Sequence, residues 1–186
     1  MTPARIIDAV LALDALSDLP RTGWLLRGIT PCESIAAHSY GVAVLTGMIV
    51  DRLRIEGHEV DGERALRLAL LHDAAEARTG DVPRPSKSPE LRAAMQAVER
   101  RVVHAMLPAS MASHFDEAAL AETLEARVVR AADKLQMLCK ALRYEQQGWR
   151  GLDEFFVGSP VQDAGIEAVR ALYVEVFRRA GRELPS

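Results

Sequence analysis

The chain has 186 residues, of which 49% are hydrophobic and 26% are charged, and its formal net charge is −3. This length suits one domain with a substantial core, so we expect a single domain over residues 1–186. The slightly acidic balance excludes nucleic-acid binding driven by bulk positive charge, although it permits a local basic pocket for one phosphate.

The sequence also argues against a membrane protein. No apolar run is long enough to span a bilayer, and Asp8, Asp14 and Asp18 do not fit a signal peptide. The two cysteines, Cys32 and Cys139, lie far apart and in no metal-type spacing. We therefore expect reduced thiols, a soluble cytoplasmic protein, and no membrane or nucleic-acid polymer as a partner.

Helical hydrophobic spacing begins near the N-terminus. Thr2 is suited to be the N-cap of a helix over residues 3–19, with Pro3 at the first helical position. The apolar stripe expected for this helix comprises Ile6, Val10, Leu13 and Leu16. Residues 20–31 contain prolines and glycines and are expected to form a loop that carries Arg21 and Trp24.

Two further helices are expected before a proline-rich loop. One spans residues 34–55 and has His38 near its start. The other spans residues 63–77, with Asp61 as its cap and Leu66 and Leu70 on its buried side. Residues 79–89 hold three prolines and a glycine, and are therefore expected to be a loop.

The second half of the chain continues the helical pattern. A helix over residues 90–107 should stop at Pro108, and Asp116 can cap a long helix over residues 117–147. A loop and a last helix, over residues 162–180, follow. No segment shows sustained period-two alternation and no internal repeat is present. The predicted fold class is all-α, a compact bundle of about six main helices.

Four polar side chains interrupt apolar faces of these helices. They are His38, the adjacent pair His72 and Asp73, and Asp133. Burying imidazoles and carboxylates in a helical core is costly unless a cation is nearby. Their mixed nitrogen and oxygen donors suit magnesium or a divalent first-row metal, and do not suit a closed thiolate zinc site.

The order of these residues resembles the H…HD…D signature of the HD-domain metal-dependent phosphohydrolases. The segments 33–39, 72–83 and 131–135 are similar to its 5′-deoxynucleotidase branch, the small HD-domain nucleoside monophosphate phosphatases. The likeness extends from Arg21 to about Gly148. One departure is Ala37, because this branch usually carries Glu immediately before the first metal-binding His.

The resemblance implies a role for each residue of the site. His38, His72, Asp73 and Asp133 would bind one divalent ion, with Mn, Co, Mg, Zn, Fe and Ni not distinguished. Glu76 and Asp81 would be the catalytic carboxylates, one of them acting on the attacking water and the other on the leaving group or the water network. The resemblance also implies a single HD domain with its metal site within residues 33–134. The helix over 162–180 would pack on this domain, and the protein would form a homodimer.

Three further residues are candidate substrate contacts. Arg21 would neutralise phosphate, Trp24 would stack on sugar or base, and Lys87 would be a second phosphate contact. Simpler interpretations stand beside these, since Trp24 can be a core anchor and Asp133 can pair with Lys134 or Arg130. A second metal ion at His104 and His114 is a further alternative.

The expected activity is hydrolysis of nucleoside or deoxynucleoside 5′-monophosphates to nucleoside and phosphate. One alternative is an alarmone pyrophosphohydrolase, a group that shares H…HD…D but typically follows it with a Glu-Asp pair where this chain has Glu76-Ala77. The other is a non-catalytic module that binds metal or nucleotide. Retention of Glu76 and Asp81 argues against that module, because binding alone requires no proton-transfer groups.

Overall fold

The computed structural model describes residues 2–83, 88–157 and 161–185. Lys87, a predicted phosphate contact, lies outside these residues. The all-α prediction is confirmed, because the described residues form helices and contain no strand beyond an isolated bridge between Pro20 and Ser34. In chain order the helices are α1 (Pro3–Asp18), α2 (Thr22–Leu25), α3 (Ile35–Ile55), α4 (Gly62–Leu71), α5 (Glu76–Thr79), α6 (Pro89–Met106), α7 (Ala109–Leu120), α8 (Leu124–Gln146), α9 (Asp153–Val157) and α10 (Glu167–Arg179).

Three predicted helix starts are confirmed by their caps, whereas the last helix, predicted over residues 162–180, begins at Glu167. The side chains of Thr2, Ser34 and Asp61 each accept a backbone N–H from the first turn of α1, α3 and α4. Such caps satisfy amide groups that have no partner within the helix. The cap at Ser34 fixes the start of α3, and thereby the position of His38 one turn later.

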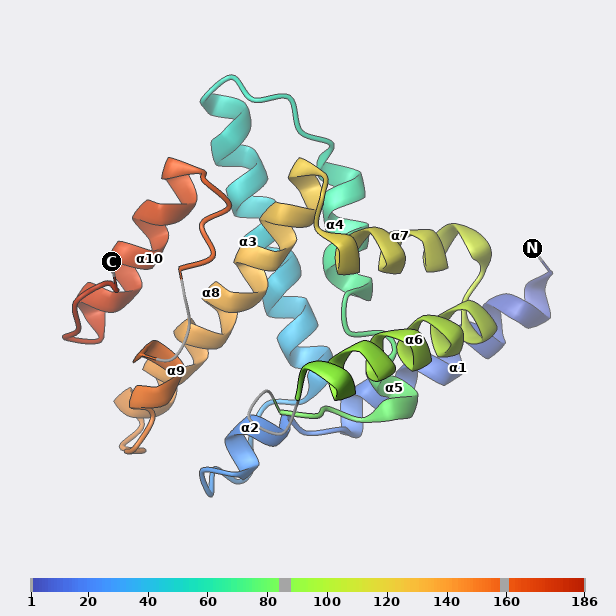
Figure 1. The fold of residues 1–186 in the computed structure, drawn as a ribbon, viewed down its shortest axis with the longest axis horizontal. Helices are drawn as coiled ribbons and strands as arrows, with labels where there is room; N and C mark the ends of the chain where they lie inside the picture. The colour runs from blue at the N-terminus through green and yellow to red at the C-terminus, as the bar shows by residue number, and fades with distance from the viewer. Residues whose placement is uncertain (1, 84–87, 158–160, 186) are drawn as a thin grey trace.

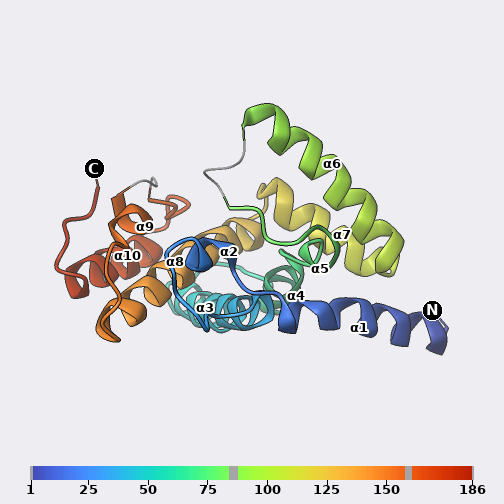
Figure 2. The same cartoon turned by 90° about the horizontal axis from the view of Figure 1, so that it is seen from below.

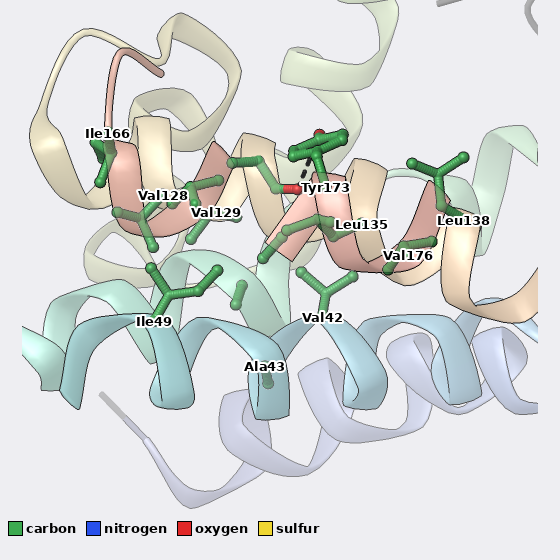
Figure 3. Packing of buried hydrophobic residues seen from close by; sticks show 14 of the residues in the cluster. Val42, Ala43, Ile49, Val128, Val129, Leu135, Leu138, Ile166, Tyr173 and Val176 are labelled. Carbon is green, nitrogen blue, oxygen red and sulfur yellow. Dashed lines mark hydrogen bonds between the residues drawn. The ribbon is translucent and has the colours of Figure 1, made fainter. Parts of the chain in front are cut away.

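Helices α3 and α8 lie side by side at the centre of the molecule, and the other helices surround them (Figures 1 and 2). Val42 and Ile49 of α3 point toward Leu135 and Val128 of α8, and α10 also packs against α8 (Figure 3). Tyr173 of α10 is buried and its hydroxyl donates to the carbonyl oxygen of Ala131. The large core therefore holds α3 and α8, the two helices that carry His38 and Asp133, in a fixed register.

Two predicted helices are each divided. The expected helix over residues 63–77 ends at Leu71, and a tight turn leads into α5. The expected long helix over residues 117–147 begins instead at Leu124, because Ala121 adopts a left-handed conformation with φ of 52° and ends α7. Asp116 is therefore a residue within α7, and Thr123 is the N-cap of α8.

Parts of the predicted apolar stripes are wrong. On α4, Leu66 and Leu70 are 39% and 55% exposed, whereas Leu68 is fully buried. The stripes 65/69 and 66/70 have the same helical spacing, so periodicity alone does not choose between them. The structure buries the alanines Ala65 and Ala69, whose small side chains allow α4 to approach α3 and α8 closely.

On α1, the predicted core residues Ile6 and Val10 are also exposed, whereas Ala9 and Leu16 are buried. Helix α1 extends along the edge of the bundle (Figure 2), so one narrow side of it meets the other helices. Within the described part of the chain, no helix combines the length and the apolar character needed to cross a membrane. Cys32 and Cys139 are free thiols, as expected.

The difference in burial between Leu68 and Leu70 on α4 gives a matched pair of stability tests. Leu68→Ala should lower the free energy of unfolding by about 2–5 kcal/mol, because it removes a fully buried side chain and leaves a cavity. Leu70→Ala should change it by less than about 0.5 kcal/mol, because that side chain is more than half exposed. Urea unfolding of both variants measures the difference, and the reverse order would contradict the placement of α4.

Candidate metal centre and active site

The predicted ligands come from three separate helices. His38 lies in the first turn of α3, His72 is the C-cap residue directly after α4, and Asp133 lies in the middle of α8. One donor atom each from these three residues lies within 4.8 Å of the others. The structure therefore brings together side chains that are 34 and 61 residues apart in the sequence.

The contact between His38 and Asp133 decides between two interpretations of that carboxylate. Nε2 of His38 lies 3.1 Å from Oδ1 of Asp133, although the Asp133 side chain is 34% exposed. The guanidinium of Arg130, one of the alternative partners, donates instead to the carbonyl oxygen of Ala119. The Asp133 carboxylate therefore contacts the imidazole of His38, although part of its side chain remains exposed to solvent.

Both imidazoles present Nε2 to the same place. Nδ1 of His38 lies 2.6 Å from Oε1 of Gln136, and Nδ1 of His72 lies 2.7 Å from the carbonyl oxygen of Ala69. Among the described residues, neither Nε2 atom has a hydrogen-bond partner, although both are buried. Buried polar atoms without partners mark a place where a ligand or ion belongs. The donor set fits one divalent ion held by His38, His72 and Asp133.

Asp73 and Glu76 lie beside these donors because the chain tightens after α4. Backbone bonds run from the amide of Ala74 to the carbonyl of Leu71 and from the amide of Glu76 to the carbonyl of Asp73. Bonds between residues three apart align side chains that are three apart. Oδ2 of Asp73 consequently lies 3.2 Å from Nε2 of His72 and 3.6 Å from Nε2 of His38.

Arg21 supplies a positive charge to this cluster of carboxylates. Its Nη1 lies 3.3 Å from Oδ2 of Asp73 and 4.0 Å from both Oε2 of Glu76 and Oδ1 of Asp81. The amide of Arg21 donates to the carbonyl of Glu33, which ties its loop to the residues before α3. The structure thus places Arg21, Glu76 and Asp81 beside the candidate metal ligands.

Asp81 also has a structural role. Its Oδ2 accepts the backbone N–H of Thr22 at 2.7 Å, and the Thr22 hydroxyl donates to the carbonyl oxygen of Asp81 at 2.8 Å. These two bonds join the loop after α5 to the start of α2. In contrast, Oε2 of Glu76 is buried and has no hydrogen-bond partner among the described residues.

Trp24 is placed differently from the prediction that it stacks on sugar or base. It is 2% exposed, and its ring lies 4.4 Å from the ring of Phe155 and 5.1 Å from that of Tyr144. Its Nε1 donates to Oε1 of Glu33 at 2.8 Å. With its faces packed in this way, the indole anchors the core and holds Glu33, and it offers no free surface for a base.

Charge and burial shift several pKa values in this site. Although burial opposes protonation, the charge of Asp73 raises the pKa of His72 to about 9. Burial and the charges of Asp73 and Asp81 raise the pKa of Glu76 to about 9. Despite burial, His72 and Arg21 hold the pKa of Asp73 well below its usual range, and His38 lowers that of Asp133. In the metal-free chain, bound protons and the guanidinium of Arg21 together offset the negative charge of the carboxylates.

The structure does not support the alternative of a second metal ion. Nε2 of His104 lies 2.9 Å from Oδ2 of Asp116 on the exposed side of α6 and α7, where Arg100 also contacts Asp116. In the described part of the chain, the only group of three or more donors that converges is the one at His38. His104 is therefore accounted for by a surface ion pair.

Two residues of the site were not assigned a role from the sequence. Gln136 contacts His38, and Glu33 contacts both Gln136 and Trp24. Gln136 lies one helical turn after Asp133, and this spacing was the signal that could have identified it. Glu33 belongs to the segment that carried the resemblance, but its burial was not evident from the sequence.

Comparisons with known proteins agree with this geometry. The model of the HD domain matches residues 13–165. The 5′-deoxynucleotidase hdd1 of Schizosaccharomyces pombe is 32% identical over 83% of this chain and 82% of its own length, and the 5′-deoxynucleotidase HDDC2 of Xenopus laevis is 29% identical over 86% of this chain and 82% of its own length. A crystal structure of a Pyrococcus horikoshii protein superposes with a TM-score of 0.81 at 33% identity, covering 93% of this chain and 99% of that one.

The raised pKa values of His72 and Glu76 predict how the metal-free chain responds to pH. The unperturbed values are 6.5 for His72 and 4.5 for Glu76, so the folded chain holds more protons than the unfolded chain between those values and about pH 9. The free energy of unfolding of the metal-free chain should therefore fall as the pH rises through this window. Urea unfolding of chelator-treated protein across it measures the trend.

A divalent cation should reverse this dependence, because it replaces the protons at His72 and stabilises the carboxylates. The rise in melting temperature on adding zinc or manganese should be larger near the upper end of the window than near pH 6. The variant Glu76→Gln should flatten the trend of the metal-free chain. A stability that increases with pH in the metal-free wild type would contradict the assigned protonation states.

Proposed function

This chain belongs to the HD-domain family, and on that premise we propose that it is a metal-dependent phosphomonoesterase acting on nucleoside or deoxynucleoside 5′-monophosphates. The products would be nucleoside and inorganic phosphate. The observation that carries the proposal is the convergence of His38, His72 and Asp133 beside Glu76 and Arg21. The names of the related 5′-deoxynucleotidases support the substrate class.

His38, His72 and Asp133 would hold the ion, and we propose Asp73 as the fourth ligand. When bound, the ion would supply a Lewis acid that neutralises charge on the phosphate oxygens. The nitrogen and oxygen donors accept magnesium, manganese, cobalt, zinc, iron or nickel. Adjacent carboxylates and imidazoles from three helices give a rigid site, since each of these helices is anchored in the core.

Glu76 is the residue that we propose to act on the attacking water. Its Oε2 is buried, accepts no hydrogen bond from the described residues and lies 4.0 Å from Nη1 of Arg21. A carboxylate oxygen without a protein partner is free to accept a proton from a water held in the same space. Arg21 would limit the charge that accumulates when Glu76 is ionised.

Arg21 would bind the phosphate, and Asp81 would act on the leaving group. The guanidinium of Arg21 can pair with two phosphate oxygens, and it lies over the carboxylates that surround the site. Asp81 would protonate the leaving alkoxide or hold the water network, through the oxygen that does not accept from Thr22. We keep Lys87 as a proposed second phosphate contact. For Trp24 we propose that it supports Glu33 in place of stacking on the base.

We also propose that the chain acts in the cytoplasm as a homodimer. The dimer follows from the family resemblance. Exposed apolar side chains at four-residue spacing on α3 are consistent with an interface between two copies, and they are Tyr40, Val44 and Met48. Light scattering of the purified chain should give twice the monomer mass, and the double variant Tyr40→Ser/Met48→Ser should shift it toward monomer. A wild-type monomer at micromolar concentration would contradict the dimer.

A panel of nucleoside monophosphates tests the activity. Each 5′-monophosphate, its 2′-deoxy form and its 3′-isomer should be incubated with magnesium, manganese or cobalt and assayed for released phosphate. We expect release from 5′-monophosphates and no pyrophosphate from a nucleotide that carries a 3′-pyrophosphate group. Pyrophosphate release would favour the alarmone hydrolase. A nucleotide that binds but remains intact with every metal would favour the non-catalytic module.

Two substitutions separate proton transfer from metal binding. Glu76→Gln should lower kcat by about 10²–10⁴-fold while the bound metal is retained, because the amide cannot accept the proton. Asp73→Ala should abolish both metal content and phosphate release, because it removes a ligand and leaves His72 without its charge partner. Elemental analysis and phosphate assays measure the two effects. Full activity in either variant would exclude the role given to that residue.

A further inference from the structure

We infer that Gln136 and Glu33 are positioning residues that fix the ring of His38 with its proton on Nδ1 and its Nε2 lone pair facing the metal site. The relay runs from Glu33 through Gln136 to His38. It deepens the proposed function, because it rests on His38 being a ligand through Nε2. Neither residue is one of the proposed metal ligands or substrate contacts.

The contacts of the relay determine the direction of each hydrogen bond. Nε2 of Gln136 donates to Oε2 of Glu33 at 3.1 Å, and Oε1 of Gln136 lies 2.6 Å from Nδ1 of His38. All three side chains are buried, and Gln136 is 98 positions from His38 along the chain. The relay therefore links the segment before α3 to the middle of α8.

Glu33 fixes the orientation of the Gln136 amide. Its Oε1 accepts from Nε1 of Trp24 at 2.8 Å, and its Oε2 lies 3.5 Å from Nζ of Lys140. A carboxylate with donors at both of its oxygens acts as an acceptor, so it faces the NH₂ end of the amide. The carbonyl end of the amide is then directed at His38, and it too can only accept.

The tautomer of His38 follows from that acceptor. An amide oxygen at 2.6 Å requires a proton on Nδ1, so Nε2 is the nitrogen whose lone pair is available when the ring binds a metal. This is the nitrogen that lies 3.1 Å from Asp133 and has no hydrogen-bond partner in the described chain. Partners of this kind orient a metal-binding imidazole, and their loss typically costs about 10–100-fold in metal affinity.

Gly41 provides independent evidence that the position of Gln136 is specified. A Cβ added at Gly41 would lie 2.9 Å from Cγ and 3.0 Å from Nε2 of Gln136. The glycine is in the middle of α3, where alanine would favour the helix more. Its lack of a side chain leaves the space that the amide of Gln136 occupies against α3.

A pair of glycine substitutions on α3 tests the relay without removing any polar group. Gly41→Ala should displace Gln136 and weaken binding of zinc, added alone, by about 10-fold or more. Gly47→Ala is the matched control, because a Cβ there would meet Cδ2 of Leu66 at an ordinary 3.8 Å. Isothermal calorimetry measures both affinities. Equal zinc affinity in the two variants would overturn the proposal.

An exchange of the two polar residues tests the hydrogen-bond directions. Gln136→Leu should lower zinc affinity and give a mixture of His38 tautomers, as measured by ring ¹⁵N shifts of the zinc-loaded chain. Glu33→Gln alone should give the same mixture, because the amide of Gln136 is then free to turn. The double variant E33Q/Q136E should restore the Nδ1–H tautomer, since the new amide donates to a carboxylate that accepts from Nδ1.

These measurements separate the relay from the proposed activity. The tautomer is measured with zinc alone and without nucleotide, so a chain that fails to hydrolyse nucleotides still tests the relay. If Gln136→Leu does not fold, Glu33→Gln and the double variant decide the outcome through the same ¹⁵N shifts. Retention of a single Nδ1–H tautomer in Glu33→Gln, or no recovery in the double variant, would overturn the proposal.

Discussion

The main constraint on this structure is electrostatic. Two imidazoles and several carboxylates are withdrawn from water into one site, and burying them there costs free energy. Placing an unpaired charge in a protein interior costs several kcal/mol, so such a cluster persists only with cations at hand. Arg21 supplies one positive charge within 3.3 Å of Asp73, and protons on His72 and Glu76 supply more in the metal-free chain. A divalent ion held by His38, His72 and Asp133 would supply the remaining positive charge.

The ends of the helices, as well as their faces, position the charged side chains of the site. Helix α4 ends at Leu71, and the tight turn that follows aligns Asp73 with Glu76 toward Arg21. A continuous helix over residues 63–77 would turn these side chains by about 100° per residue and separate their carboxylates further around its axis. The buried relay from Glu33 to Gln136 in turn ties the imidazole of His38 to the core, so the site is supported on two sides.

The sequence was sufficient where chemistry alone constrained the fold and the site. The all-α class and the convergence of His38, His72 and Asp133 were predictable, because ionisable residues buried on apolar helix faces require a partner and a cation is the simplest one. The division at Ala121 was not predictable, since a left-handed alanine has no signal of the kind that glycine or proline gives.

Other features depend on neighbours from distant segments, which periodicity does not report. Leu68 is buried in place of Leu66 because of how α4 meets α3 and α8. Trp24 is buried because Tyr144 and Phe155 pack against its ring. Gln136 orients His38 across a separation of 98 positions in the chain. Each of these contacts exists only once the helices have packed.

The most direct test of the central claim is anomalous diffraction from a crystal of the chain grown with zinc or manganese. We expect one anomalous peak per chain, at about 2.0–2.2 Å from Nε2 of both His38 and His72 and from a carboxylate oxygen of Asp133. A peak bound through Nδ1 of either imidazole, or a site distant from Asp133, would contradict the account.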